Sequence, residues 1–104
     1  MTEALPRRVA VTGMGTVSAL GNDCTSFWRS LVAGNSGIRR IESVNADGLR
    51  FQNGAEVRGL DLGAIFPPKR LDEMDRFTAL AVVAAREAID GANVPWTPTL
   101  RQRT

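Results

Sequence analysis

The chain has 104 residues, of which 43% are apolar and 23% charged, with a formal net charge of +2. This length predicts one domain at most, and the composition is that of a globular protein rather than a disordered, collagen-like or disulfide-rich one. With no histidine and a single cysteine, the chain cannot form a Cys/His zinc site or a complete Ser-His-Asp or Cys-His catalytic site. We therefore expect no metal ion and no cofactor.

The charge pattern and the apolar runs bear on partners and location. The basic excess lies at the two ends of the chain, and the body between residues 9 and 100 is slightly acidic, which does not indicate a nucleic-acid partner. No apolar run approaches the roughly 20 residues that span a bilayer. The charged, proline-containing start at residues 1–8 is unlike a secretory signal. We expect a cytoplasmic protein without a membrane span.

The first predicted elements are a strand and a short helix. Residues 8–12 form an apolar, β-branched run that predicts a strand buried on both faces. A glycine-rich loop over residues 13–21 follows, and Gly34 is placed to end the helix in a left-handed conformation. The candidate N-caps of this helix are Asn22, Asp23 and Thr25, and its apolar residues are Phe27, Trp28, Leu31 and Val32.

The middle and end of the chain predict one long helix between less regular segments. Residues 36–49 are expected to be mostly loop, and residues 55–57 a second strand. The pair Pro67-Pro68 favours a helix start. From residue 69 to about residue 91 the apolar spacing predicts a single helix of about 22 residues, roughly 33 Å long. The polar and basic tail, residues 97–104, is typical of a linker.

The second half of this predicted helix has a face made almost entirely of alanine. Alanine favours the helix and lets another backbone approach closely, but it buries little apolar area. We therefore expect this helix to need a closely packed partner, and the chain to be marginally stable in isolation. The residues of this face are Ala81, Ala84, Ala88 and Ala92.

Two features of the first part of the chain invite a chemical interpretation. Gly13 and Gly15 follow a predicted strand, but a dinucleotide-binding loop needs a small third residue where the chain has Ser18, and the helix begins too late to face a pyrophosphate. A glycine turn is the favoured interpretation, and a small nucleotide-binding protein the alternative. Cys24 lies near a helix start, where a thiol pKa falls. Without any histidine, a small residue at a helix start is favoured over a nucleophile.

Charged residues gather where the long helix is predicted to begin. Lys69 and Arg70 oppose the helix dipole there, so they either form a solvated first turn or serve an acidic partner. Asp75 and Arg76 could form an ion pair that anchors the helix. The residues alone therefore predict an α/β segment with no recognisable catalytic site.

Several separate motifs stand along the chain: RRVAVTGMGTVSALGN at residues 7–22, Phe27-Trp28, LVAGNSGI at residues 31–38, MDRFT at residues 74–78 and AAREA at residues 84–88. These motifs resemble the β-ketoacyl-acyl carrier protein synthases, most nearly synthase II. They occur in that family's order and spacing, and the resemblance covers residues 7–96, nearly the whole chain. The resemblance implies that residues 1–104 are part of a ketosynthase N-terminal domain, with a linker-like tail at residues 97–104.

The resemblance also implies a fold and a reaction. The fold would be α/β and thiolase-like, a five-layered structure of two similar halves, with this chain as an incomplete first half. The full-length enzymes are homodimers. They move an acyl chain from acyl carrier protein to a cysteine, and decarboxylated malonyl-acyl carrier protein then attacks the thioester with the help of two histidines. None of those catalytic residues matches a position in this chain, so we expect the chain alone to be inactive.

The family's docking surface for acyl carrier protein has basic residues near the start of the long helix. Lys69 and Arg70 match part of it, and they are the only site residues that the resemblance assigns here. The favoured hypothesis is thus an N-terminal fragment of a 3-oxoacyl-acyl carrier protein synthase of fatty acid or polyketide biosynthesis. The alternative is a non-catalytic interaction module, or a decayed gene product, that binds a synthase partner.

Overall fold

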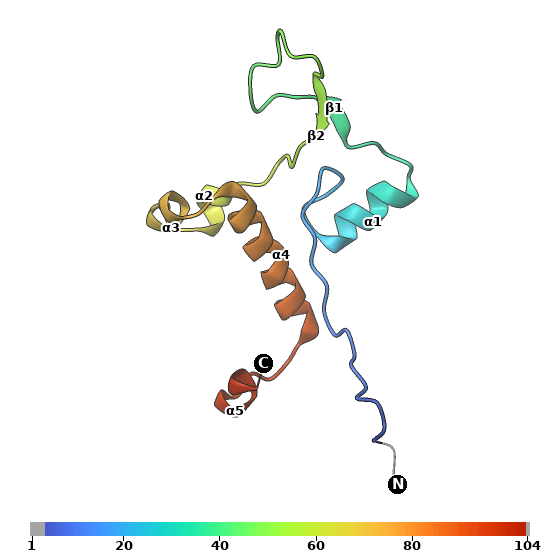
Figure 1. Ribbon diagram of the computed structural model, residues 1–104, viewed down its shortest axis with the longest axis vertical. Helices are drawn as coiled ribbons and strands as arrows, with labels where there is room; N and C mark the ends of the chain where they lie inside the picture. Colours follow the sequence, from blue (N-terminus) through green and yellow to red (C-terminus); the bar gives the residue numbers. More distant parts are fainter. Residues whose placement is uncertain (1–3, 104) are drawn as a thin grey trace.

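A computed structural model of the protein describes residues 4–103 and shows helices with one small sheet (Figure 1). The structure thus mixes helices with few strands, and the two strands form an antiparallel pair. In chain order the elements are α1 (Cys24–Val32), β1 (Ile38–Arg40), β2 (Asn53–Ala55), α2 (Leu62–Ile65), α3 (Pro68–Glu73), α4 (Arg76–Ala92) and α5 (Pro98–Gln102).

The molecule is extended, with principal extents of 67 × 37 × 26 Å. Its radius of gyration is 18.8 Å, whereas a compact domain of this length has about 13 Å. Its solvent-accessible surface is 8860 Å², against roughly 5,700 Å² for a compact protein of this mass. Within residues 4–103 only Ala46, Phe66 and Ala79 are buried. The sequence permitted a compact core, but the chain does not form one.

The strand predicted at residues 8–12 is not formed. The segment is extended, but no strand lies beside it within the described part of the chain. An apolar β-branched run favours an extended backbone, yet a strand also needs a neighbour for its N–H and C=O groups. The prediction of a strand here was therefore wrong for this chain, because that neighbour is absent.

Helix α1 follows the local signals in the sequence. The Asp23 carboxylate accepts a hydrogen bond from the Ser26 N–H at 2.7 Å, which makes Asp23 the N-cap among the three candidates. Gly34 lies just beyond the C-cap residue Ala33 with a φ of +73°, as predicted. Before the helix, the Ser18 N–H donates to the Gly21 carbonyl and closes a tight turn.

The hairpin formed by β1 and β2 differs from expectation. Ile38 pairs with Ala55 and Arg40 with Asn53, so β1 lies inside the segment expected to be loop, and β2 precedes the strand predicted at residues 55–57, overlapping it only at Ala55. A side-chain contact ties the segment between the two strands back to β1. Arg40 forms an ion pair with Asp47 at 2.7 Å. Strands this short carry too little apolar alternation to be recognised from sequence.

The long helix predicted over residues 69–91 is two helices. Met74 and Asp75 are both extended, which separates α3 from α4 and directs α3 away from the α4 axis (Figure 1). The apolar spacing continues across these two residues, so periodicity could not reveal the break. Helix α4 ends at Ala92, where Asn93 adopts a left-handed φ of 51°. Within the expected linker, residues 98–102 form α5, with Thr97 as N-cap, and Thr104 lies outside the described residues.

The alanine face of α4 packs against the glycine loop, as expected for a helix that admits a close backbone. A Cβ atom added to Gly13 would overlap the Ala88 backbone oxygen, and one added to Gly15 would overlap that of Ala84. No side chain fits at either glycine. The two glycines therefore serve close packing between the loop and α4, which is a structural role as in the favoured interpretation, although residues 13–15 themselves form no turn.

Candidate functional site

The main long-range polar contact of the molecule is a junction built around Glu87 of α4. Glu87 Oε1 accepts a hydrogen bond from the Thr16 N–H at 2.9 Å, and Oε2 accepts one from the Cys24 N–H at 3.0 Å. One carboxylate thus joins the glycine loop, the first residue of α1 and the middle of α4. We call this set, Thr16, Cys24 and Glu87, the Glu87 junction.

The junction changes the protonation of both its titratable groups. Hydrogen bonds from the Cys24 and Thr16 N–H groups lower the pKa of the Glu87 carboxyl, because they stabilise its charged form. Loss of hydration, followed by the nearby Glu87 carboxylate, raises the pKa of the Cys24 thiol. At neutral pH Cys24 is therefore a protonated thiol, which is the less nucleophilic form. This supports its assignment as a structural residue.

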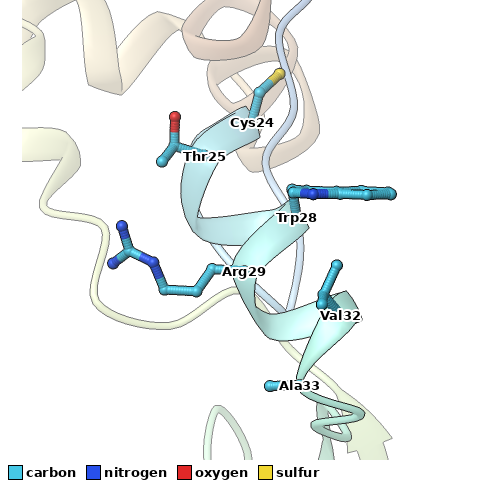
Figure 2. Close-up of a pocket in the computed structure, with 6 residues that line it drawn as sticks. All are labelled: Cys24, Thr25, Trp28, Arg29, Val32 and Ala33. Carbon is cyan, nitrogen blue, oxygen red and sulfur yellow. The ribbon is translucent and has the colours of Figure 1, made fainter.

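The outer face of α1 is hollowed and apolar. Cys24, Trp28 and Val32 line a hollow of about 600 Å³ together with Thr25, Arg29 and Ala33. Figure 2 shows Trp28 and Val32 projecting to one side of the helix, while Thr25 and Arg29 project to the other. Trp28 and Val32 are exposed despite being large and apolar. Such a surface is typical of a binding face rather than of a solvated one.

The predicted docking residues Lys69 and Arg70 lie on α3, not at the start of the long helix. Both are exposed, and no described residue forms a hydrogen bond or ion pair with either side chain. The break at residues 74–75 separates them from the Glu87 junction, so the structure does not bring these two sets together. Their charges are available to a partner, and they touch no other candidate site residue.

The ion pair suggested for Asp75 and Arg76 is not formed. The ion pairs of residues 4–103 are Arg40–Asp47 and Arg58–Glu56. The Arg76 guanidinium instead donates to the Val57 carbonyl oxygen at 3.4 Å, which ties the start of α4 to the segment after β2. The helix is anchored as expected, but by a backbone oxygen rather than by a carboxylate.

Sequence reasoning overlooked two acidic side chains, Glu87 and Glu56, that organise the chain. Glu87 lies within the recognised AAREA segment, and an acid beside an alanine face that packs on a loop was the available signal. Glu56 accepts hydrogen bonds from the Glu42 and Ser43 N–H groups, which lower the pKa of its carboxyl. Asn22 Nδ2 donates to the Arg58 carbonyl at 2.7 Å and joins the start of α1 to the hairpin. Both acids thus hold backbone segments together.

The described residues hold no further site of a recognisable chemical type. Residues 4–103 contain no group of three His, Cys, Asp or Glu side chains that could hold a metal ion. No helix in this range is long and apolar enough to cross a membrane.

Nearly the whole chain matches one protein family. The family described as "Beta-ketoacyl synthase, N-terminal domain" matches residues 6–104. The 3-oxoacyl-[acyl-carrier-protein] synthase 2 of Coxiella burnetii is 39% identical over 82 residues, which is 79% of this chain and 20% of that synthase. Nodulation protein E of Rhizobium meliloti is 41% identical over 90 residues, 86% of this chain and 22% of that protein.

A solved structure agrees with the sequence matches. "The ishigamide ketosynthase/chain length factor" superposes with a TM-score of 0.73 at 32% identity, over 86% of this chain and 22% of that chain. The arrangement described above therefore recurs in part of a ketosynthase. The chain spans about a fifth of the length of the relatives that it matches.

Proposed function

The chain belongs to the β-ketoacyl synthase family, and we propose that it forms the N-terminal portion of a 3-oxoacyl-acyl carrier protein synthase. The observation that carries this proposal is the family match over residues 6–104, together with the superposition on a ketosynthase. The parent enzyme would be a cytoplasmic homodimer with a thiolase-like fold that needs no cofactor. It would act in fatty acid or polyketide biosynthesis.

The proposed reaction of the parent is a decarboxylative Claisen condensation. An acyl group passes from the carrier-protein thiol to an enzyme cysteine, forming one thioester and breaking another. Malonyl-acyl carrier protein then loses CO2, and the carbanion that remains attacks the enzyme thioester, which releases the cysteine thiolate. Two histidines assist the second step. This chain has no histidine, and the pKa of its one cysteine is raised, so these groups belong to the rest of the parent.

The contribution of this chain is positional. The Glu87 junction fixes the glycine loop against α4, and the two glycines allow that contact to be close. Lys69 and Arg70 of α3 provide two unpaired positive charges to the acidic acyl carrier protein. Exposed charges of this kind act mainly on the rate of association and on its salt dependence.

The non-catalytic alternative keeps the same binding surfaces but gives the chain no place in an enzyme. In that hypothesis the chain, as an interaction module or a decayed gene product, binds a synthase partner without contributing to turnover. The exposed apolar residues of α1 are compatible with either function. A functional replacement experiment separates them, because only the first hypothesis requires the chain to support catalysis.

The test replaces the matched region of the Coxiella burnetii synthase with residues 6–104 of this chain. We expect the folded chimera to release CO2 from malonyl-acyl carrier protein and to elongate acyl-acyl carrier protein. The 104-residue chain alone should give no turnover above the enzyme-free control. A chimera that folds as a dimer but has no condensing activity would contradict the proposed function.

The docking residues are tested in the same chimera. The double substitution Lys69→Glu and Arg70→Glu should raise the KM for acyl-acyl carrier protein several-fold at low salt, with kcat little changed, and the effect should shrink as salt rises. The matched control is Arg101→Glu with Arg103→Glu, which reverses two other exposed charges. Equal KM values for both double variants would remove Lys69 and Arg70 from the docking surface.

A further inference from the structure

A contact between Arg86 and Phe66 joins α4 to the segment between α2 and α3. The Arg86 guanidinium lies over the Phe66 ring, with its Cζ atom 4.8 Å from the ring centroid. A cation at this distance is attracted by the negative face of an aromatic ring. Phe66 is only 4% exposed, and Arg86 forms no ion pair with any carboxylate of residues 4–103. The charge of Arg86 is therefore directed to the ring rather than to an acid.

The contact lies on the side of α4 that faces away from the glycine loop. Ala84 and Ala88, which pack on that loop, are each two residues from Arg86, and this spacing is about 200° around a helix. Ala79, which is 1% exposed, lies about two turns before Arg86 and therefore on the same side as Arg86. Helix α4 thus has the glycine loop on one side and Phe66 on the other.

Phe66 controls the direction of α3 because two prolines follow it. Phe66 is the C-cap of α2 and directly precedes Pro67 and Pro68, whose rings fix φ at both positions. The Pro67 carbonyl accepts a hydrogen bond from the Arg70 N–H at 2.9 Å, which closes the first turn of α3. Little backbone freedom therefore remains between the Phe66 ring and the proposed docking residues Lys69 and Arg70.

The other end of α3 is held less firmly. Met74 and Asp75 are both extended, and Asp75, the N-cap of α4, makes no capping hydrogen bond with its side chain. Among residues 4–103, α3 lies against α2 rather than along α4 (Figure 1). The orientation of α3 relative to α4 therefore depends on the end at Phe66, and Arg86 joins that end to α4.

We propose that Arg86 is a positioning residue for carrier-protein docking. Through its contact with the Phe66 ring, Arg86 holds α3 in the orientation in which Lys69 and Arg70 meet the acidic acyl carrier protein. This inference rests on the proposed function, because it concerns the same two docking residues. The effect of Arg86 on docking passes through Phe66, so it disappears when the aromatic ring is removed.

The test uses the chimera that carries residues 6–104, with Arg86→Met, Phe66→Leu and both substitutions together. Methionine keeps an unbranched side chain without the charge, and leucine keeps an apolar side chain without the ring. Two quantities are measured at low salt: the association rate constant for acyl carrier protein, which needs no turnover, and the KM and kcat for acyl-acyl carrier protein.

We expect Arg86→Met to lower the association rate constant and to raise KM about two- to fivefold, with kcat little changed. This is the range expected for a cation–π contact at an exposed site, and a contact can favour one orientation by no more than its own free energy. In the Phe66→Leu background, Arg86→Met should have no further effect, because the two side chains act as one unit. Arg86→Lys, which keeps a cation for the ring, should restore most of the association rate.

The matched control is a second contact of the same chemical type. Arg50 lies over the ring of its neighbour Phe51, with its Cζ atom 5.7 Å from the ring centroid. These two residues are adjacent in the chain and join no separate elements. Arg50→Met therefore removes the same charge and the same kind of contact without acting on α3, and it should leave KM and the association rate constant within the error of the unsubstituted chimera.

Three results would overturn the proposal. The first is an Arg86→Met chimera whose association rate constant and KM are unchanged. The second is a loss that persists in full in the Phe66→Leu background, because Arg86 would then act on the carrier protein directly. The third is an equal loss in Arg50→Met, which would show a general effect of positive charge. Failure of the proposed function is a separate result, since a dimeric chimera that binds carrier protein without condensing activity would refute the catalytic role alone.

Discussion

Residues 8–12 and residues 13–16 adjoin in the chain but differ in the contacts that they make. The first segment is exposed and makes no backbone hydrogen bond within residues 4–103, while the second lies against α4 so closely that only glycine fits at two of its positions. The second segment finds its partner within this chain, in the alanines and Glu87 of α4. The first has no partner among residues 4–103, so the described part of the chain contains one complete interface and one incomplete one.

Among the substitutions at the contact between the glycine loop and α4, we expect Gly15→Val to have the largest effect on stability. The new side chain would overlap the Ala84 backbone oxygen, and neither backbone can move without opening the loop–helix contact. We expect the free energy of unfolding of the chimera that carries residues 6–104 to fall by about 3 kcal/mol, measured by urea denaturation with circular dichroism.

The matched control for this substitution is Gly91→Ala, because an added Cβ there meets no atom and the residue is helical. Alanine should stabilise the helix by about 0.5–1 kcal/mol at that position. If the Gly15→Val variant proved as stable as the unsubstituted protein, the close contact between the loop and α4 would be contradicted.

A smaller loss is expected for Glu87→Ala, which removes the acceptor of the Thr16 and Cys24 N–H groups. Because water can reach these groups, we expect a loss of only about 1 kcal/mol in the free energy of unfolding. Glu73→Ala, at an exposed acid of α3, should change it by less than about 0.5 kcal/mol. Similar losses in both variants would mean that the Glu87 junction contributes no specific stability.

The smallest effect is a dependence on pH. The Glu87 pKa is lower in the folded chain than its ordinary value of 4.5, so the folded state binds fewer protons than the unfolded state in this range. The stabilisation from Glu87 is thus complete above about pH 4.5 and is lost as the pH falls through the lowered pKa. Urea denaturation of the unsubstituted protein and of the Glu87→Gln variant gives their free energies of unfolding. The difference between these two free energies should become smaller as the pH falls. A difference that grows as the pH falls would contradict a lowered pKa for Glu87 in the folded chain.

The sequence predicted local features of the structure better than it predicted long-range ones. The left-handed Gly34 follows from its residue type and was confirmed, and of the three candidate N-caps, Asn22, Asp23 and Thr25, the structure selects Asp23. The break between α3 and α4 was missed because Met74 and Asp75 keep the apolar spacing intact. Asp75 was nevertheless a local signal, since aspartate is a preferred N-cap residue.

Long-range features were predictable only in part. The alanine face of α4 indicated a close partner, and the glycine loop proved to be that partner. Nothing in the periodicity indicated that Glu87 joins Thr16 to Cys24, because the residues it bonds are 63 and 71 positions away. The strand at residues 8–12 was mispredicted for the opposite reason, since the run is strand-like but its neighbour is absent from the described structure.

Amide hydrogen exchange across residues 8–24 of the free 104-residue chain tests most directly whether one interface is complete and the adjoining one is not. We expect the Thr16 and Cys24 amides, which donate to Glu87, to exchange at least tenfold more slowly than an unstructured chain. The amides of Val9 and Val11 should exchange at the unstructured rate. Equal protection of all four amides would contradict the account, because residues 8–12 would then already have a partner within the chain.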